Sequence, residues 1–360
     1  MRARLEDVCE RGSSNLRQAD VAGRSGDYPI YGASGYIGNV DFYHQELPYV
    51  AIVKDGAGIG RTVLLPAKSS VIGTMQYLLP KKNVLPEYLC YVVRYMHLEK
   101  YFSGATIPHI YFRDYKSEEF NLVPVDYQEE IVATLGKIEA IVAARQRQLQ
   151  KLDELVKARF IELFGGIHNS NKYPYKPIQE LTDVISGGTP NRDVNEYWEC
   201  GTIPWVKTTE LQNNLIKEVD EYITEKGLNS SSAKLVPPGT VLIAMYGQGK
   251  TRGMTAYLNI EACTNQACAC ILPSDQINQT FLWKFLILSY DNLRGMAKGG
   301  NQPNLNGTII KNYPILYPPI ELQEQFAAFV EQTDKSKAVI QKALDEAQLL
   351  FDSLMQKYFG

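Results

Sequence analysis

Two glycine-rich segments offer the first possible chemistry, because backbone N–H groups in a tight glycine turn can converge on an anion. Residues 247–251 read Gly-Gln-Gly-Lys-Thr. The nucleotide-binding pattern GxxxxGK[ST] needs its first glycine at position 244, which is Ala244. Residues 55–61 place Arg61 where GxGxxG needs its third glycine, and no lysine follows the last glycine. We therefore expect no nucleotide-binding loop at either place.

Both segments nevertheless combine a glycine-rich turn with basic side chains. Lys54 and Arg61 flank the first turn, and Lys250 and Arg252 lie in the second. Such a turn can lie against a phosphate backbone and donate N–H groups to it. It can equally be an ordinary hairpin, and the residues leave both interpretations open.

Other polar loops could read the edges of DNA bases. The second half of the chain contains Gly-Gly-Thr-Pro-Asn-Arg, Ile-Pro-Trp-Val-Lys-Thr-Thr and Gly-Gly-Asn-Gln-Pro-Asn. Asn and Gln can pair with adenine, and Arg and Lys with guanine. Asn, Gly and Pro also form ordinary turns, so each residue has two interpretations. The candidates in these loops are Thr189, Arg192, Lys207, Thr208, Gln302 and Asn304.

The chain shows no pattern typical of an enzyme. Its four histidines are scattered, and no GxSxG, HExxH or paired-carboxylate motif is present. We expect no catalytic residue, no metal site and no cofactor.

These loops must be positioned by a duplicated scaffold. Residues 124–165 and 319–360 align without a gap. Each copy opens with a proline and a Gln-Glu pair, continues as a helical pattern and stops at Phe-Gly. Asp126 and Glu129 resemble a capping box, and Gly165-Gly166 is typical of a helix end. The pattern predicts two long helices, each preceded by its own globular segment.

Both helical copies show the 4-3 spacing of a coiled-coil seam. Because a globular segment precedes each helix, we expect the helices to pair in an antiparallel manner. The polar seam positions Arg145, Thr333 and Lys337 could fix the register. We predict the apolar interface residues to be Ile131, Leu135, Ile138, Val142, Leu149, Leu152, Val156, Phe326, Val330, Ile340, Leu344, Phe351 and Leu354.

The globular segments are predicted to be mixed α/β and related to each other. Strand-like runs occur at 49–54, 240–246 and 267–272, and an amphipathic helix is predicted at 86–101 and at 279–297. Short motifs recur in order in both halves, including Thr-Met-Gln at 74–76 and Thr-Asn-Gln at 264–266. A shared scaffold that carries loops of different length suits a protein that recognises two different targets.

Composition limits the alternatives. The formal net charge of −3 argues against an indiscriminate DNA coat, although local basic surfaces remain compatible with it. No apolar run is long enough to cross a bilayer, and we expect no secretory signal, because residues 1–7 are charged and lack an apolar segment. The six cysteines include no CxxC pair. We expect reduced cysteines and a cytoplasmic location.

Taken together, the duplicated helix entries, the Phe-Gly ends and the ordered motifs resemble the specificity (S) subunit of type I restriction–modification systems. The motifs include Tyr-Pro-Ile-Tyr-Gly-Ala-Ser-Gly-Tyr-Ile-Gly at 28–38, Ser-Gly-Gly-Thr-Pro at 186–190 and Gly-Asn-Gln-Pro-Asn at 300–304. The resemblance covers the whole chain. It implies an α+β protein with two target-recognition domains, 1–123 and 166–318, separated by an antiparallel coiled coil of helices 124–165 and 319–360.

The resemblance also implies a non-catalytic DNA-recognition subunit. Each recognition domain would read half of a bipartite target in double-stranded DNA, and the helix pair would set the spacer. Partners would be two methyltransferase (M) subunits of an adenine-specific enzyme and, in the full complex, restriction (R) subunits. Two alternatives remain open: a two-domain protein scaffold that binds no DNA, and the recognition subunit of another multi-subunit restriction system.

Overall fold

The structure is a computed structural model, and it describes residues 1–56, 58–104, 108–247, 249–297 and 304–360. The chain forms two compact units. Unit 1 comprises Met1–Arg147 together with Ile340–Gly360, and unit 2 comprises Gln148–Val339. Each unit therefore contains a globular segment and one half of each long helix.

The two long helices are α5 (Val125–Phe164) and α10 (Ile320–Phe359), each of 40 residues. Gly165 has a positive φ of 84°, a conformation that glycine adopts without strain, and it ends α5 as predicted. The expected cap at Asp126 is wrong, because α5 already begins at Val125. Asp126 instead lies in the first turn, where a carboxylate interacts favourably with the helix dipole.

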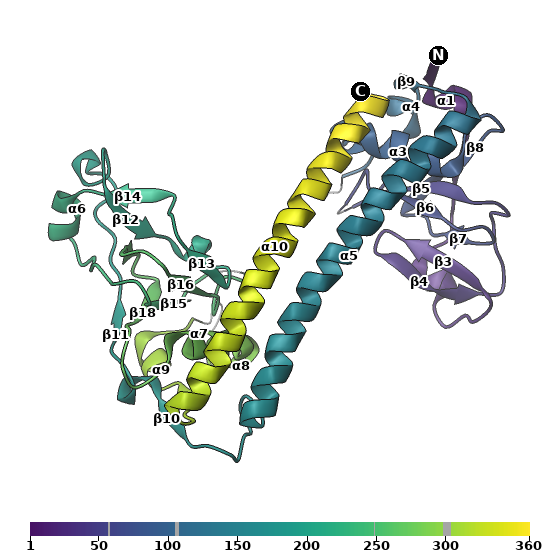
Figure 1. Ribbon diagram of the computed structural model, residues 1–360. Coiled ribbons are helices and arrows are strands. Elements are labelled where there is room, and N and C mark those ends of the chain that lie inside the picture. The colour runs from purple at the N-terminus through teal and green to yellow at the C-terminus, as the bar shows by residue number, and fades with distance from the viewer. Residues whose placement is uncertain (57, 105–107, 248, 298–303) are drawn as a thin grey trace. The chain divides into compact units, whose positions relative to one another are not determined.

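Unit 1 contains two sheets (Figure 1). The strand order is β2-β8-β5-β6 in the larger sheet and β4-β3-β7 in the smaller, and β1 pairs with β9. The strands are β1 (Arg2–Arg4), β2 (Cys9–Ser13), β3 (Tyr28–Gly32), β4 (Gly35–Val40), β5 (Tyr49–Val53), β6 (Thr62–Leu65), β7 (Ser70–Val71), β8 (Met75–Pro80) and β9 (Glu119–Asn121).

The main core of unit 1 joins the larger sheet to its helices. The expected helix at 86–101 is α3 (Pro86–Tyr95) followed by a separate turn, η1 (Leu98–Tyr101). The remaining short helices of unit 1 are α1 (Leu5–Val8), α2 (Gln18–Val21) and α4 (Phe112–Tyr115). Residues from α3, the first half of α5 and the last turns of α10 share one apolar cluster, including Tyr88, Leu135 and Phe359. The two long helices thus run antiparallel within this unit.

Unit 2 repeats this plan with one added strand. Its sheets have the orders β11-β18-β15-β16-β13 and β14-β12-β17, and β10 pairs with β19. The strands are β10 (Tyr175–Pro177), β11 (Val184–Ser186), β12 (Ile203–Val206), β13 (Asn214–Ile216), β14 (Glu221–Ile223), β15 (Val241–Ala244), β16 (Thr255–Leu258), β17 (Cys263–Thr264), β18 (Cys268–Ile271) and β19 (Pro314–Leu316).

The main core of unit 2 is built around aromatic rings. The expected helix at 279–297 is divided into α7 (Gln279–Leu288) and α8 (Tyr290–Gly295). The other short helices are η2 (Ile178–Glu180), η3 (Asn195–Tyr197), η4 (Thr208–Glu210), α6 (Glu225–Asn229) and α9 (Gly307–Lys311). Phe160 of α5, Phe281 of α7 and Phe326 of α10 pack with ring centroids 5.4 to 6.2 Å apart.

The predicted seam positions of both long helices are buried or half-buried. Burial is complete near the globular segments, as at Leu135 and Phe326, and partial in the middle of the helices, as at Leu149 and Leu344. Within unit 2, the seam residue Lys337 forms an ion pair with Asp153 at 2.5 Å. A polar residue in the seam thus has a specific partner, which favours one register.

Every strand of unit 1 has a counterpart in unit 2, and this corrects one of the motif matches made from the sequence. Val53 and Ala244 are equivalent, because each lies three residues before the first glycine of a glycine-rich loop. Val53 pairs with Met75 in unit 1, and Ala244 pairs with Cys268 in unit 2. Position 76 therefore corresponds to position 269. The match of Thr-Met-Gln at 74–76 with Thr-Asn-Gln at 264–266 is wrong by three residues. Three residues separate β7 from β8, and three separate β17 from β18, so Thr264 corresponds to Val71.

Candidate nucleic-acid interface

Arg192 and Lys207 of unit 2 converge on one carboxylate. Arg192 Nη1 lies 2.5 Å from Glu221 Oε2, and Lys207 Nζ lies 2.9 Å from Glu221 Oε1. Burial alone would raise the pKa of the Glu221 carboxyl, but hydrogen bonds from Lys207 and Arg192 outweigh it and hold the pKa below its usual value. The structure thus brings two predicted cations together, and both already have an acidic partner.

Two tryptophans support this cluster. The guanidinium of Arg192 lies 3.6 Å from the ring centroid of Trp198 and 4.7 Å from that of Trp205. Trp205 is buried, and its indole N–H donates to the carbonyl of Gly188 at 2.9 Å. The cation–π contacts and this hydrogen bond tie the loop at 187–192 to the end of β12.

The predicted threonines lie beside this cluster. Thr189 donates a hydrogen bond to the side chain of Gln266, which precedes β18. Thr208 follows Lys207 directly and begins the turn η4. Thr189, Arg192, Lys207 and Thr208 therefore occupy neighbouring loops in one part of unit 2.

Lys250 and Arg252 lie on a different loop, which Arg294 of α8 organises. Arg294 donates to the carbonyl oxygens of Arg252 at 2.6 Å and Gly249 at 2.8 Å. Tyr290 donates to the carbonyl oxygen of Lys250 at 2.7 Å. These hydrogen bonds engage the backbone of the loop, and the Lys250 side chain is exposed to solvent.

The last two predicted residues of unit 2 have different outcomes. Gln302 lies outside the described residues. Asn304 is half-buried, and its neighbour Leu305 donates a backbone hydrogen bond to Met245 at the end of β15. Asn304 thus lies next to the strand that leads into the glycine-rich loop.

In unit 1, Lys54 and Arg61 stand on the two arms of the β5–β6 hairpin. Lys54 forms an ion pair with Asp55 at 2.6 Å, and Asp55 also lies 2.7 Å from Nδ1 of His109. Burial alone would raise the pKa of Asp55, but the hydrogen bonds from Lys54 and His109 hold it below its usual value. Arg61 is exposed.

A cleft of about 500 Å³ opens beside Lys54. It lies between the ends of β2, β5 and β8 and the segment 110–116. Basic, polar and aromatic side chains line it, with one carboxylate among them: Arg11, Ser13, Ser14, Asn15, Lys54, Asp55, Gln76, Ile110, Tyr111, Phe112, Arg113 and Lys116. Cations beside amides and aromatic rings suit a nucleic acid.

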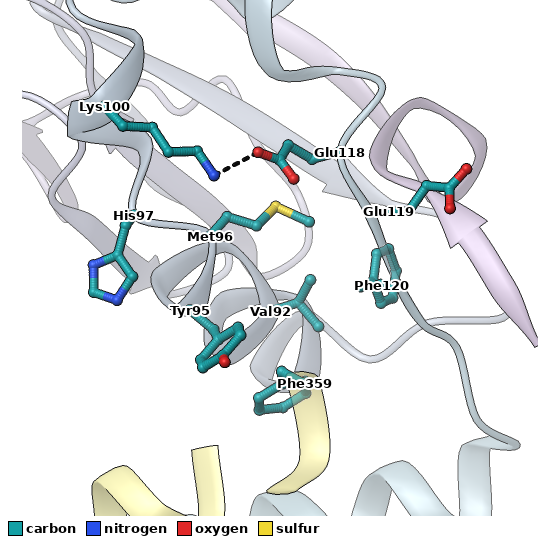
Figure 2. Close-up of a pocket in the computed structure, with 9 residues that line it drawn as sticks. All are labelled: Val92, Tyr95, Met96, His97, Lys100, Glu118, Glu119, Phe120 and Phe359. Atoms are coloured by element: carbon teal, nitrogen blue, oxygen red, sulfur yellow. Dashed lines mark ion pairs between the residues drawn. The ribbon is translucent and has the colours of Figure 1, made fainter. Parts of the chain in front are cut away.

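A second cavity of unit 1, of about 330 Å³, has a different character (Figure 2). Val92, Met96, Phe120 and Phe359 give it an apolar wall. Lys100 reaches across to Glu118, and the two form an ion pair at 2.6 Å. With Glu119 also in the lining, this cavity is poorly suited to a phosphate backbone.

Sequence reasoning missed several residues that shape these sites. Glu221, Arg294 and the Asp55–His109 pair were not predicted, although each holds a predicted cation or its loop. Glu221 is 29 residues from Arg192, and Arg294 is 42 residues from Arg252. Only the position of Arg294 late in the predicted amphipathic helix at 279–297 offered a signal.

Neither a metal-binding cluster nor a membrane-spanning helix is found in the described ranges. No cluster of three or more His, Cys, Asp or Glu side chains suited to a metal ion occurs among the described residues. None of the helices in this part of the chain has the length and apolar character needed to span a membrane.

Sequence comparison identifies the family. The family described as type I restriction modification DNA specificity domain matches residues 1–154 and 171–348. The chain therefore belongs to this family.

Curated relatives show the same likeness. The chain is 24% identical over 210 residues to the type I restriction enzyme EcoR124I/EcoR124II specificity subunit of Escherichia coli, covering 58% of this chain and 52% of the relative. It is 23% identical over 328 residues to the MjaVIII specificity subunit of Methanocaldococcus jannaschii, covering 82% and 76%. The match to the E. coli relative thus spans about half of that protein's length.

Solved structures share the fold. The S subunit of a type I restriction–modification system from M. genitalium matches with a TM-score of 0.64 at 15% identity, covering 100% of this chain and 96% of that one. A chain from a study of complex assembly and conformational transition of the type I R-M system matches with a TM-score of 0.55 at 16% identity, covering 99% and 97%. These likenesses establish a mixed α/β fold in which α5 packs against α10.

Proposed function

We propose that this chain is the DNA-recognition subunit of a type I restriction–modification complex. Residues 1–123 would read one half of a bipartite target and residues 166–318 the other half. Helices 124–165 and 319–360 would set the spacer between the half-sites. The main support is the duplication itself: two sheets of matching order recur in each unit, while the loops at their ends differ.

The family supports a proposal about the partners as well. Two methyltransferase subunits would dock on this chain and methylate adenine, and restriction subunits would join them to cleave DNA. The complex would act in the cytoplasm, which fits six free cysteines in a reducing compartment. The chain itself would contribute recognition and assembly, with no catalytic residue, metal or cofactor of its own.

The proposed DNA contacts divide into two groups. Lys54, Arg61, Lys250 and Arg252 lie beside or within the two glycine-rich loops and would contact phosphates. Thr189, Thr208, Gln302 and Asn304 would contact bases or order the loops that do. Arg192 and Lys207 would have to exchange Glu221 for phosphate, so their ion pairs make them the weaker phosphate candidates.

Single-molecule methylome sequencing tests the proposed function. A host would express the methyltransferase encoded beside the gene for this chain, either together with this chain or without it. The proposal expects a split motif, with N6-methyladenine in both halves, only when the chain is present. A soluble complex with the methyltransferase that gives no chain-dependent motif would favour a protein scaffold instead.

A second experiment tests the phosphate contacts. Replacing Arg252 by alanine should weaken binding to all DNA sequences about equally. The slope of log affinity against log salt should become shallower by about one, because one fewer counterion is released. An unchanged slope would refute the assignment of Arg252.

A further inference from the structure

Gln76 is an unusual residue at the cleft of unit 1. Its side chain is 1% exposed, and its Nε2 makes no hydrogen bond within the described part of the chain. The hydroxyl of Tyr115 lies close enough to interact with this amide, and the interaction partly offsets the rise that burial causes in the pKa of Tyr115, but the two groups do not reach hydrogen-bond geometry. A buried amide donor without a partner is costly, so such a group calls for an explanation.

The duplicated fold supplies a reference for this position. Gln76 pairs with Ile52 in β5, and the corresponding residue of unit 2, Ala269, pairs with Ile243 in β15. Ala269 is buried in the apolar core of unit 2. The scaffold is therefore satisfied by a small apolar side chain here, and the amide of Gln76 is not required by the fold.

The same comparison explains why the cleft is open. Lys54, which lines the cleft, corresponds to Met245, because Ile110 donates to the carbonyl of Lys54 as Leu305 does to that of Met245. Met245 and Leu305 belong to the main apolar cluster of unit 2. Unit 1 thus has cationic and amide groups where unit 2 has an apolar core.

The charge of the cleft is positive. Its lining includes four basic residues, Arg11, Lys54, Arg113 and Lys116, and one acidic residue, Asp55. Lys116 pairs with Glu6 and Arg113 with Asp114, but the side chains of Lys116 and Arg113 are 44% and 77% exposed. Exposed ion pairs contribute little free energy, so these cations can exchange their partners cheaply.

We propose that this cleft binds a phosphate group, with the Gln76 amide donating to a phosphate oxygen and Arg11 and Lys54 supplying charge. The inference rests on the proposed function, in which the phosphate belongs to the DNA backbone of the first half-site. A free nucleotide presents the same chemistry and is the other possible source. Through this cleft, unit 1 contacts the DNA backbone with side chains at positions where unit 2 has apolar core residues.

The test uses the full chain and three variants. Gln76→Glu keeps the shape but repels phosphate, and Arg11→Ala removes a cation of the cleft. Lys100→Ala, which removes a cation from the acidic cavity of the same unit, is the matched control (Figure 2). Affinity for a random-sequence duplex is measured over a salt series. Melting temperature is measured with inorganic phosphate or adenosine monophosphate, against chloride at equal ionic strength.

The proposal expects Gln76→Glu to lower duplex affinity at least tenfold and Arg11→Ala to reduce the salt slope by about one. Lys100→Ala should match the wild type. If phosphate or adenosine monophosphate raises the melting temperature of the wild type but not that of Gln76→Glu, the site is one that free ligands can also enter. An effect confined to the duplex identifies the DNA backbone as the source.

A fourth variant separates binding from folding. Gln76→Met removes the buried unpaired donor, so it should leave the melting temperature unchanged or raise it while weakening duplex binding. If it destabilises the chain and all cleft variants bind duplex like the wild type, Gln76 is a structural residue and the proposal is overturned. If the wild type itself binds neither duplex nor phosphate, the proposed function fails together with the cleft.

Discussion

The side-chain oxygen of Gln128 accepts a hydrogen bond from the backbone N–H of Leu85 at 2.9 Å. Gln323, its counterpart in the repeat, accepts one from the backbone N–H of Asn278, also at 2.9 Å. Leu85 and Asn278 are the N-cap residues of α3 and α7. The Gln of each Gln-Glu pair thus fastens the start of a core helix to the long helix of its own unit.

Replacing either glutamine by leucine should destabilise its own unit by about 3 kcal/mol. Gln128 also donates to the carbonyls of Asn83 and Val123, so its loss leaves several backbone groups without partners, at roughly 1 to 3 kcal/mol each. Urea denaturation of the full chain measures the cost. Gln146→Leu, at an exposed position of α5, is the control and should change the free energy of unfolding little. Equal effects of Gln128→Leu and Gln146→Leu would contradict the assignment.

A buried lysine in unit 2 gives a second prediction. Lys284 of α7 is 9% exposed and pairs with Asp334 of α10 at 3.2 Å. Burial lowers the pKa of Lys284, and the charge of Asp334 opposes this. Asp334→Ala should therefore cost about 2 kcal/mol, because a buried charge loses its partner.

The double variant Lys284→Met/Asp334→Ala should recover much of that loss, since methionine fills the same space without a charge. A double-mutant cycle followed by urea denaturation measures the coupling. Additive effects of the two substitutions would show that the ion pair makes no specific contribution.

The Glu221 cluster should respond to acid. Because the pKa of Glu221 is held below its unfolded value of about 4.3, its stabilising effect is present above that value and is lost as pH falls through the lower folded pKa. Protonation releases Arg192 from Glu221 and disturbs its contact with Trp198. Tryptophan fluorescence should change below about pH 4, and Glu221→Gln should abolish that transition. A transition that persists in the variant must come from another group.

The loop that contains Lys250 and Arg252 offers a proteolytic test. Arg294→Met removes the donors that hold the carbonyls of Gly249 and Arg252. Trypsin should then cleave after Lys250 and Arg252 about ten times faster, and duplex affinity should fall. Lys311→Met, at an exposed position of α9, should leave both rates of cleavage unchanged. Unaltered cleavage in Arg294→Met would mean that other contacts order the loop.

The scaffold was predictable because its determinants are local and repeated. A 3.5-residue apolar spacing, a Gln-Glu entry and a Phe-Gly end predict the long helices, and β5, β15 and β18 lie within the strand runs that the sequence indicates. The site was less predictable. The partnership of Arg192 with Glu221 links the loop after β11 to strand β14. The open cleft depends on Gln76 and Lys54 lying at positions that unit 2 fills with Ala269 and Met245.

The division of the long helices between units also affects how the chain folds during synthesis. Unit 2 is one continuous stretch, Gln148–Val339, whereas unit 1 needs Ile340–Gly360 to complete its core. Met355 and Phe359 belong to the same apolar cluster as Tyr88 and Leu135. Unit 1 leaves the ribosome first, but its core is completed last. Until residues 340–360 are translated, the apolar face of α3 and the first half of α5 lack the side chains of α10 that pack against them.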